Sequence, residues 1–308
     1  MWNFSLLTAL VVWGRLAPLL VVRLAVFLSA ALVLALTMAL GVWLGVSLRP
    51  VGGDRDALLG GLAGLAVAAL VLAIPGHRFR QIQQILMIAL VADSLDGVRV
   101  PLGRGQIAHA RAAVAARFGT PAQAATLYRH VRSVARKVPD VAEGVGPILS
   151  RPILGRLATG GLVNQAVLVH AYRARPENAW EAAHDGLVLA TQNARELLGA
   201  AFRINAVGWA LTLAVFLVLL PPFVGLLVLW PAAGAQSGIV AAALAAMAIR
   251  LALIQPFALA CLVQAFLRIT AGQQPLGEWR GRLTQISAPF RDLGDQAVGW
   301  APETAQVA

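Results

Sequence analysis

Four long apolar runs divide the sequence, at 24–48, 58–75, 206–230 and 238–267. About 20 apolar residues are enough for an α-helix to cross the hydrocarbon core of a bilayer. Backbone groups in lipid must be satisfied internally, so each run is predicted to be helical. Because the connection is short between the first two runs and again between the last two, the pattern predicts two transmembrane hairpins.

The middle of the chain, 77–203, carries apolar positions at helical spacing instead of continuous apolar runs. A helix over 105–118 is expected to end at Gly119, and Thr120-Pro121 is expected to cap and begin the next helix. The apolar stripe of that next helix follows the 3.6-residue period: Ala124, Leu127, Tyr128, Val131, Val134 and Ala135.

The opposite face of the same helix is basic, with Arg129, Arg132, Arg136 and Lys137. Such a face suits a membrane surface or a partner helix. Binding to nucleic acid is disfavoured, because the sequence has no aromatic stacking platform and no nucleic-acid-binding motif. We therefore treat these four residues as a candidate lipid or partner surface and expect no nucleic-acid partner.

The N-terminal segment 2–22 is apolar but is separated from the first span by Arg15, Pro18 and Arg23. This separation predicts an interfacial helix in the head-group layer. No cation precedes its apolar residues and no cleavage site follows, so we expect the segment to be retained instead of being removed as a signal peptide.

Three other segments are less regular. Residues 157–172 are apolar but short for a span, which predicts a surface-lying or re-entrant helix. A long helix is expected to begin at Glu177 and to continue straight into the third span, and residues beyond Trp300 are expected to be disordered. The C-terminal apolar positions have heptad spacing, which predicts one amphipathic helix that packs on the cytoplasmic helices or contacts another subunit: Trp279, Leu283, Ile286, Phe290 and Leu293.

In the second span, Gly60 and Gly64 form a small-xxx-small pair. Such pairs let two helices approach closely in lipid. The partner helix can belong to the same chain or to a second subunit, and the sequence leaves both interpretations open.

Composition agrees with a membrane protein, because 59% of the 308 residues are hydrophobic and only 13% are charged. Soluble domains have about 25% charged residues. The predicted fold is an all-α integral membrane protein, with four transmembrane helices in two hairpins and a cytoplasmic or interfacial layer of amphipathic helices. The expected regions are 1–76 with the first hairpin, 77–203 as the cytoplasmic helices, 204–268 with the second hairpin, and 269–308 as the C-terminal helix and tail.

The formal net charge is +11, and cations flank the spans on one side: Arg15, Arg23, His77, Arg78, Arg80, Arg268, Arg280 and Arg282. The two connections within the hairpins, 49–57 and 231–237, have no net charge. Cations favour the cytoplasmic side, so both termini and 77–203 are predicted to be cytoplasmic. Membrane lipids, chiefly anionic ones, are the expected partners, together with a second copy or another membrane protein.

Polar and helix-breaking residues inside the second hairpin form the candidate solute site or gate: Arg250, Gln255, Pro256, Gln264, Pro221 and Pro222. An arginine at the centre of a span costs about 2.5–3.5 kcal/mol on insertion scales, so Arg250 should face protein or water. It serves either as a site for an anionic group, or as a structural arginine bonded to carbonyls that the prolines leave without donors.

No enzyme motif is present: there is no phosphate-binding loop, no HExxH and no GxSxG. The histidines lack metal-ligand spacing, and the single cysteine, Cys261, lies in the last span, so no intrachain disulfide can form. Glu181, His184 and Asp185 share one helix and are most simply a solvated face. We expect no enzymatic activity, no metal and no cofactor.

Three stretches, GRGQIAHARAAVAARFG, NAWEAAHDGLVLATQN and IQPFALACLVQAFLRITAGQQPLGEWRGRLTQIS, together resemble a family of bacterial integral membrane proteins. The resemblance covers most of the chain after residue 58 and implies the cytoplasmic (inner) membrane of a bacterium, but no activity. Members of that family carry a lysine and a glutamate where this chain has Arg250 and Gln255. The missing acid argues against a proton-linked role at that position.

A second resemblance concerns NQAVLVHAYRARPENAWEAAHDGLVLATQN and the long span that follows it. This part of the chain is similar to the C-terminal half of choline-transporter-like proteins. It implies a transporter-like ancestry for 160–268. The pattern of those proteins has a serine where this chain has Trp180 or Glu181, and the cysteines of those proteins are absent here. The favoured function is thus a non-enzymatic, oligomeric or partner-bound membrane scaffold, and the alternative is a transporter or channel subunit for a small or lipid-like solute near Arg250.

Overall fold

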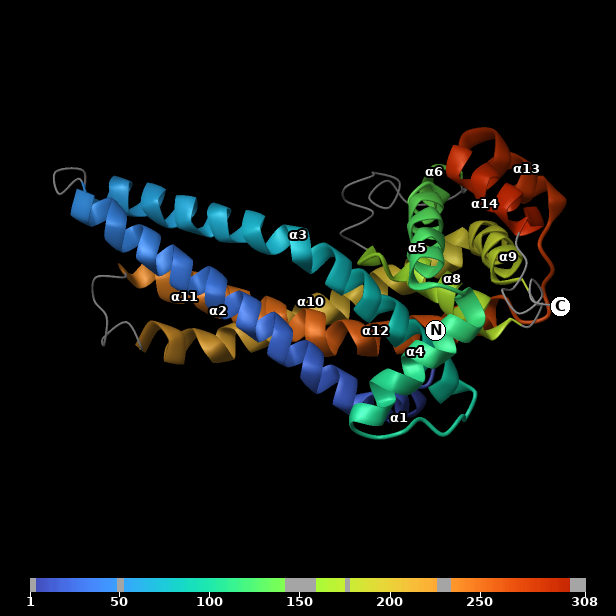
Figure 1. Cartoon of the computed structure of the whole chain (residues 1–308), viewed down its shortest axis with the longest axis horizontal. Helices are drawn as coiled ribbons and strands as arrows, with labels where there is room; N and C mark the ends of the chain where they lie inside the picture. The colour runs from blue at the N-terminus through green and yellow to red at the C-terminus, as the bar shows by residue number, and fades with distance from the viewer. Residues whose placement is uncertain (1–3, 49–52, 142–158, 175–177, 226–233, 300–308) are drawn as a thin grey trace. The chain divides into compact units, whose positions relative to one another are not determined.

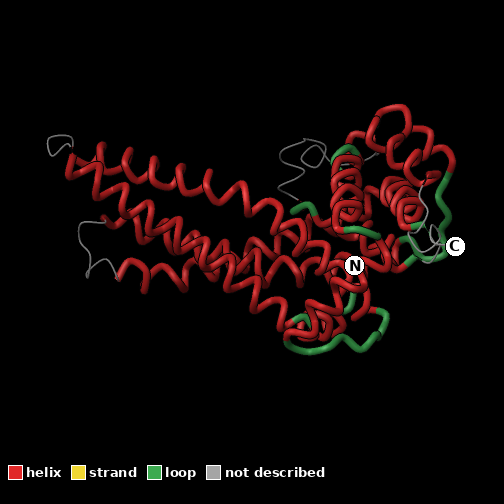
Figure 2. Tube along the Cα trace, in the orientation of Figure 1, coloured by secondary structure: helices red, strands yellow, loops and turns green. Residues whose placement is uncertain are grey.

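The structure, a computed structural model, describes residues 4–48, 53–141, 159–174, 178–225 and 234–299. Within these ranges every regular element is helical, which confirms the all-α prediction (Figure 2). The expected helix start at Glu177 and the expected disorder after Trp300 lie outside the described residues.

Figure 1 shows the helices in chain order. They are α1 (Leu6–Arg15), α2 (Ala17–Leu48), α3 (Gly53–Leu95), α4 (Arg104–Phe118), α5 (Pro121–Ala135), α6 (Val138–Val141), α8 (Leu162–Arg173), α9 (Ala179–Gln192), α10 (Ala194–Gly225), α11 (Gly234–Ile249), the π-helical stretch η3 (Arg250–Ile254), α12 (Gln255–Ile269), α13 (Gly277–Ile286) and α14 (Ala288–Gly299).

The chain divides into two compact units. Unit 1 comprises Met1–Leu19, Gln81–Val207 and Pro256–Ala308. Unit 2 comprises Leu20–Arg80 and Gly208–Gln255.

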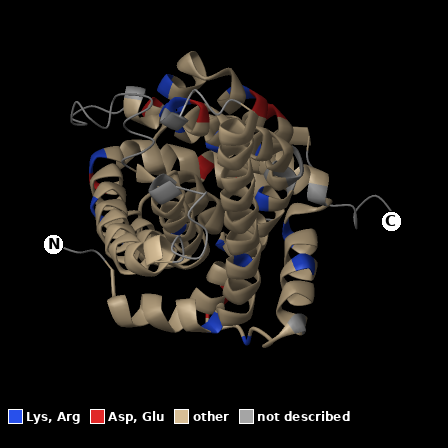
Figure 3. Ribbon diagram, turned by 90° about the vertical axis from the view of Figure 1, so that its left-hand side faces the viewer, with Lys and Arg blue, Asp and Glu red and all other residues tan. Residues whose placement is uncertain are grey.

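Four helices are long and apolar enough to cross a membrane: Ala17–Leu48, Arg55–Ala73, Ala194–Gly225 and Ser237–Ile269. They coincide with the four predicted apolar runs and are compatible with a multi-pass membrane protein. In Figure 3 most of the ribbon is neither Lys or Arg nor Asp or Glu, in keeping with a chain in which only 13% of the residues are charged.

In unit 2, α2 and α3 lie side by side and run in opposite directions (Figure 1). A Cβ atom added to Gly60 would lie 2.2 Å from the carbonyl oxygen of Gly41, and one added to Gly64 would lie 2.2 Å from that of Thr37. The small residues therefore serve a contact within the chain, which is one of the two interpretations left open by the sequence.

The start of the first span differs from the prediction. α1 ends at Arg15, and α2 already begins at Ala17, so Arg23 lies inside the helix and not in front of it. Pro18 does not break α2, because it is the second residue of the helix, where a missing N–H costs nothing. In unit 1, the side-chain amide of Gln106 joins the two helices by bonding both Arg15 O and Leu19 N.

The local predictions for unit 1 are confirmed at α5. Gly119 has φ +74°, and Thr120 and Gln123 form a reciprocal capping box around Pro121. The apolar stripe is buried except for the half-buried Ala135, and its members pack towards α4, α8, α9 and α14.

The predicted segment 157–172 is helical from Leu162 onward, and this helix is largely buried in protein. α8 is a central helix of unit 1, with nine of its 12 residues buried, among them the polar Asn164 and Gln165. A helix that is buried on nearly all sides needs neighbours around it. Here those neighbours are α5 and α9, so protein covers most of this short run, and its placement at or in a membrane stays a prediction.

Two predicted continuous helices are interrupted. Asn193 separates α9 from α10; its side chain donates to Leu189 O at 3.0 Å, a local bond that competes with the helical backbone. Ser287, with an extended backbone, separates α13 from α14, because Pro289 lacks the N–H that a continuous helix would need. The heptad is broken there, and Ile286 is exposed, but α14 does pack on α9 and α5.

Candidate functional site

Arg250 is the first residue of η3 and belongs to unit 2. Its Nη1 atom donates to Thr212 Oγ1 at 3.1 Å, and its Cζ atom lies 4.0 Å from the ring centroid of Trp209. An aromatic face at that distance stabilises a cation electrostatically. A Cβ on Gly208 would lie 3.3 Å from Arg250 Nη1, so the small residue leaves room for the guanidinium.

The π-helical stretch leaves one backbone carbonyl without a helical donor. The N–H of Gln255 donates to Arg250 O, five residues back, and therefore not to Leu251 O. In the π register the donor for Leu251 O would be the N–H of residue 256, and Pro256 has none. Short π-helical segments occur frequently at functional positions.

Arg23 supplies the missing donor. Its Nη2 atom donates to Leu251 O at 3.0 Å, and its side chain is only 2% exposed. The ring of Phe27 lies 5.6 Å from its Cζ atom. The Nε and Nη1 atoms of Arg23 are buried without a hydrogen-bond partner among the described residues. The arginine that bonds a carbonyl freed next to a proline is thus Arg23, which sequence reasoning had placed outside the span.

Acidic residues are scarce in unit 2. Its segments contain only Asp54 and Asp56. Asp56 lies next to Gly45 of α2, about 33 Å along that helix from Arg23 at 1.5 Å per residue. The described contacts of Arg23 are accordingly with a neutral carbonyl and an aromatic ring.

The other residues of the candidate solute site have different surroundings. Pro221 and Pro222 are exposed near the C-terminal end of α10, and Gln255 is half-buried in unit 2. In unit 1 Pro256 is buried, and Gln264 accepts a hydrogen bond from Ser5 N at 3.2 Å while donating to Ala260 O. The contacts described for these residues do not converge on one site.

The predicted basic surface of α5 is partly engaged in unit 1. Lys137 Nζ donates to Ile286 O at 3.0 Å, where it satisfies a carbonyl at the end of α13. Arg132 is half-buried, whereas Arg129 and Arg136 are exposed. The part of this surface that can meet a lipid or a partner is therefore centred on the two exposed arginines.

Sequence reasoning missed a polar cluster in unit 1. The Asp93 carboxylate, 8% exposed, accepts a hydrogen bond from Tyr172 Oη at 2.9 Å and lies 2.9 Å from His109 Nε2. Burial, together with the negative charge of Asp93, raises the pKa of Tyr172. Beside it, Arg173 Nε donates to Asp96 at 2.8 Å. The cluster joins α3, α4 and α8 and keeps Tyr172 neutral; no regular spacing in the sequence indicates it.

The expectation of a solvated face at Glu181, His184 and Asp185 is wrong for two of the three. His184 stacks on Phe290 with ring centroids 4.0 Å apart, and Asp185 lies 2.7 Å from Arg280 Nη2. Burial raises the pKa of Asp185, but the nearby His184 ring and the charge of Arg280 outweigh it and hold the pKa below its usual value. These groups fasten the C-terminal helices onto α9.

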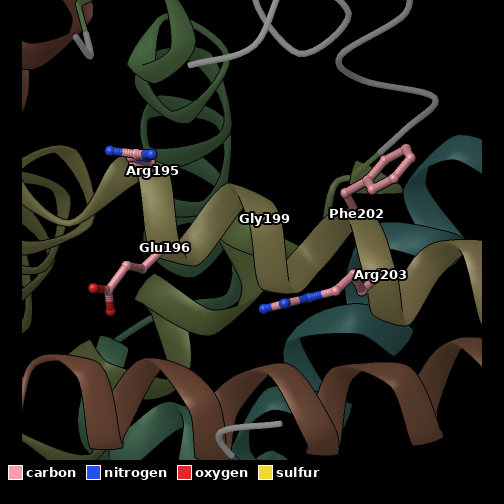
Figure 4. A pocket seen from close by; sticks show the side chains of 5 residues that line it. All are labelled: Arg195, Glu196, Gly199, Phe202 and Arg203. Atoms are coloured by element: carbon pink, nitrogen blue, oxygen red, sulfur yellow. The ribbon is translucent and has the colours of Figure 1, made fainter. Parts of the chain in front are cut away.

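An open hollow lies along one face of α10 in unit 1, with a volume of about 450 Å³ (Figure 4). It is lined by Arg195, Glu196, Gly199, Phe202 and Arg203. The described part of the chain contains no group of three or more histidine, cysteine or acidic side chains that could hold a metal. The hollow is therefore lined by charged and apolar side chains, and those side chains do not form a metal-binding group.

In comparisons with known proteins, no family model, no curated protein and no solved structure matches this chain. The resemblances seen in the sequence stay predictions.

Proposed function

We propose that the chain is a non-enzymatic, multi-pass protein of a bacterial cytoplasmic membrane that assembles with itself or with another membrane protein as a scaffold. In this proposal the four apolar helices cross the bilayer as two hairpins, both termini are cytoplasmic, and the amphipathic helices between residues 77 and 203 form a cytoplasmic or interfacial layer. Anionic lipids contact that layer.

The observation that supports a scaffold best is the set of contacts made by two arginines inside the apolar helices. Arg250 contacts Thr212 and Trp209, and Arg23 contacts Leu251 O. Intramembrane ionisable residues mark solute pathways by default. Here both guanidinium groups bind groups of their own chain, which favours a role in holding helices together.

The alternative is a transporter or channel subunit for a small or lipid-like solute near Arg250. One observation favours it: Nε and Nη1 of Arg23 are buried without a described partner, beside a π-helical stretch. A buried cation without an acid is costly, so an anionic solute would be a suitable ligand.

Native mass spectrometry of the chain extracted together with its surrounding lipids tests the proposal. We expect a mass above that of the 32.3 kDa monomer, from a second copy or a co-purified protein. The topology is tested in a Cys261→Ser background, with single cysteines at Arg55 and Arg280 labelled from either side of the membrane. A monomer, or labelling of Arg280→Cys from the outside, would overturn the proposal.

Transport is tested separately with Arg250→Ala and Arg23→Met reconstituted in vesicles. The scaffold proposal predicts that each variant loses assembly to the same extent as it loses thermal stability. Ion or solute flux through the wild-type protein that disappears in a variant with unchanged stability and mass would instead support the transporter.

A further inference from the structure

The hollow on α10 lies where the charged part of that helix ends. Arg195, Glu196 and Arg203 are the charged residues of α10, and all three lie in its first third. The uncharged remainder, 204–225, is about 33 Å long at 1.5 Å per residue. That length matches the roughly 30 Å hydrocarbon core of a bilayer. In the proposed topology Arg203 is therefore at the inner boundary of the hydrocarbon, and Arg195 is on the head-group side of it.

The side chains around the hollow are available to a ligand. Arg195, Glu196, Phe202 and Arg203 are exposed, and no ion pair or side-chain hydrogen bond is described for the three charged ones within the described part of the chain. Gly199 has no atom within 4 Å of the place where a Cβ would stand, so the centre of the hollow is open (Figure 4).

Charge and apolar surface are arranged in the order of a phospholipid. Two arginines and one glutamate give a net positive charge, and guanidinium groups bind phosphate oxygens through paired N–H donors. Phe202, 41% exposed, is next to Arg203 at the hydrocarbon boundary, where an aromatic ring contacts the upper part of an acyl chain.

We propose that this hollow binds one anionic phospholipid, with Arg203 on its phosphate, Arg195 beside its head group and Phe202 against its acyl chain. The inference rests on the proposed membrane topology and adds a site to it. An acidic peptide could also bind the arginines, but it would not account for an exposed phenylalanine at the level of the acyl chains. Each arginine near an anionic leaflet strengthens binding by about fivefold.

The test measures lipid binding to the full-length protein in detergent by native mass spectrometry, with added phosphatidylglycerol or phosphatidylcholine. We expect one phosphatidylglycerol to be retained more strongly than phosphatidylcholine. The double variant Arg195→Gln/Arg203→Gln should lose about 25-fold in affinity, and Glu196→Gln should gain about fivefold.

The matched control is Arg268→Gln. Arg268 is an exposed arginine in the last turn of α12 and does not line the hollow. It should change phosphatidylglycerol retention by less than about twofold, since it removes the same charge elsewhere. Equal losses in Arg203→Gln and Arg268→Gln, or equal retention of both lipids by the wild type, would overturn the site.

Failure of the site can be told apart from failure of the proposed function. If cysteine labelling places Arg280 inside and the mass shows an assembly, but the lipid results go against the site, only the lipid inference falls. If labelling places Arg280 outside, the depth argument for α10 falls with the topology. Circular dichroism of each variant verifies that the exposed substitutions leave the helices intact.

Discussion

Units 1 and 2 are both built from α-helices, but they differ in where their apolar side chains lie. In unit 2 only 11% of the most apolar window of Arg55–Ala73 is buried, and Val67 and Leu70 are 64% and 68% exposed. In unit 1 the apolar stripe of α5 is buried, with Leu127 at 1% and Val131 at 0%. The first arrangement is compatible with an apolar solvent, whereas the second excludes water from its own core.

The difference shows what holds each unit together. Between helices in lipid there is little hydrophobic driving force, so in the proposed membrane topology unit 2 relies on close backbone approach and on a few polar contacts. Unit 1 relies on burial of large side chains and on surface ion pairs. Substitutions of the same kind should therefore have different effects in the two units.

The largest effect is expected in the core of unit 1. Phe290 is fully buried and stacks on His184, so Phe290→Ala should lower the free energy of unfolding by about 3–5 kcal/mol. Hydrogen exchange should increase in α5, α9 and α14, while Arg55–Ala73 in unit 2 keeps its protection.

Ile286→Ala is the matched control for Phe290→Ala. Ile286 belongs to the same C-terminal helices but is 44% exposed, so its truncation should change the free energy of unfolding by about 0.5 kcal/mol or less. If Phe290→Ala reduced hydrogen-exchange protection as much in Arg55–Ala73 as in α5, α9 and α14, the separation into two kinds of core would be contradicted.

The next effect is expected at the α2–α3 contact. The new methyl group of Gly60→Ala would stand 2.2 Å from Gly41 O, so the two helices must move apart. Overpacking of this kind costs about 1–3 kcal/mol. Gly76→Ala lies on the same helix in open space and should be neutral or stabilising by up to about 1 kcal/mol. Thermal unfolding in detergent distinguishes the two, and similar Tm values would contradict the close contact.

Much of unit 1 is predictable because its signals are local. Gly119, Thr120 and Gln123 form the end of one helix and the start of the next within five residues, and the stripe of α5 repeats along one helix. α8 is different: its sequence is mostly apolar without a clear polar face, which indicates burial but not whether lipid or protein covers it. That distinction depends on α5 and α9, which no spacing within α8 reveals.

The polar contacts were harder to predict than the helices. Arg23 was taken to mark the edge of a span, because a cation next to an apolar run usually does. Its partner is a carbonyl that becomes free only where a π-helical stretch meets Pro256. Asp93, His109 and Tyr172 come from three separate helices, so their meeting follows from the tertiary fold alone.

A smaller effect is expected at Arg250. Arg250→Ala removes a charged hydrogen bond and a cation–π contact but also a cation from an apolar segment, so the net loss should be about 1–2 kcal/mol. In a double-mutant cycle with Thr212→Val, measured by thermal unfolding, the coupling should be about 1 kcal/mol. Additive losses would mean that the hydrogen bond contributes nothing to holding α10 in place.

The smallest effect concerns the pH response of unit 1 and arises at His170. Burial lowers the pKa of His170 below its ordinary value of 6.5, helped by the charge of Arg173 and opposed by that of Asp185. Below pH 6.5 the unfolded chain takes up this proton before the folded one, so stability is complete above that pH and declines as the pH falls towards the folded pKa. In His170→Gln the part of the Tm decline between pH 7 and pH 5.5 that comes from His170 should be absent.

The contribution of Asp185 falls in another pH range, since its lowered pKa affects stability only below its ordinary value of 3.8. Equal Tm slopes for the wild type and His170→Gln would mean that the ring at Phe266 is open to water in the folded protein.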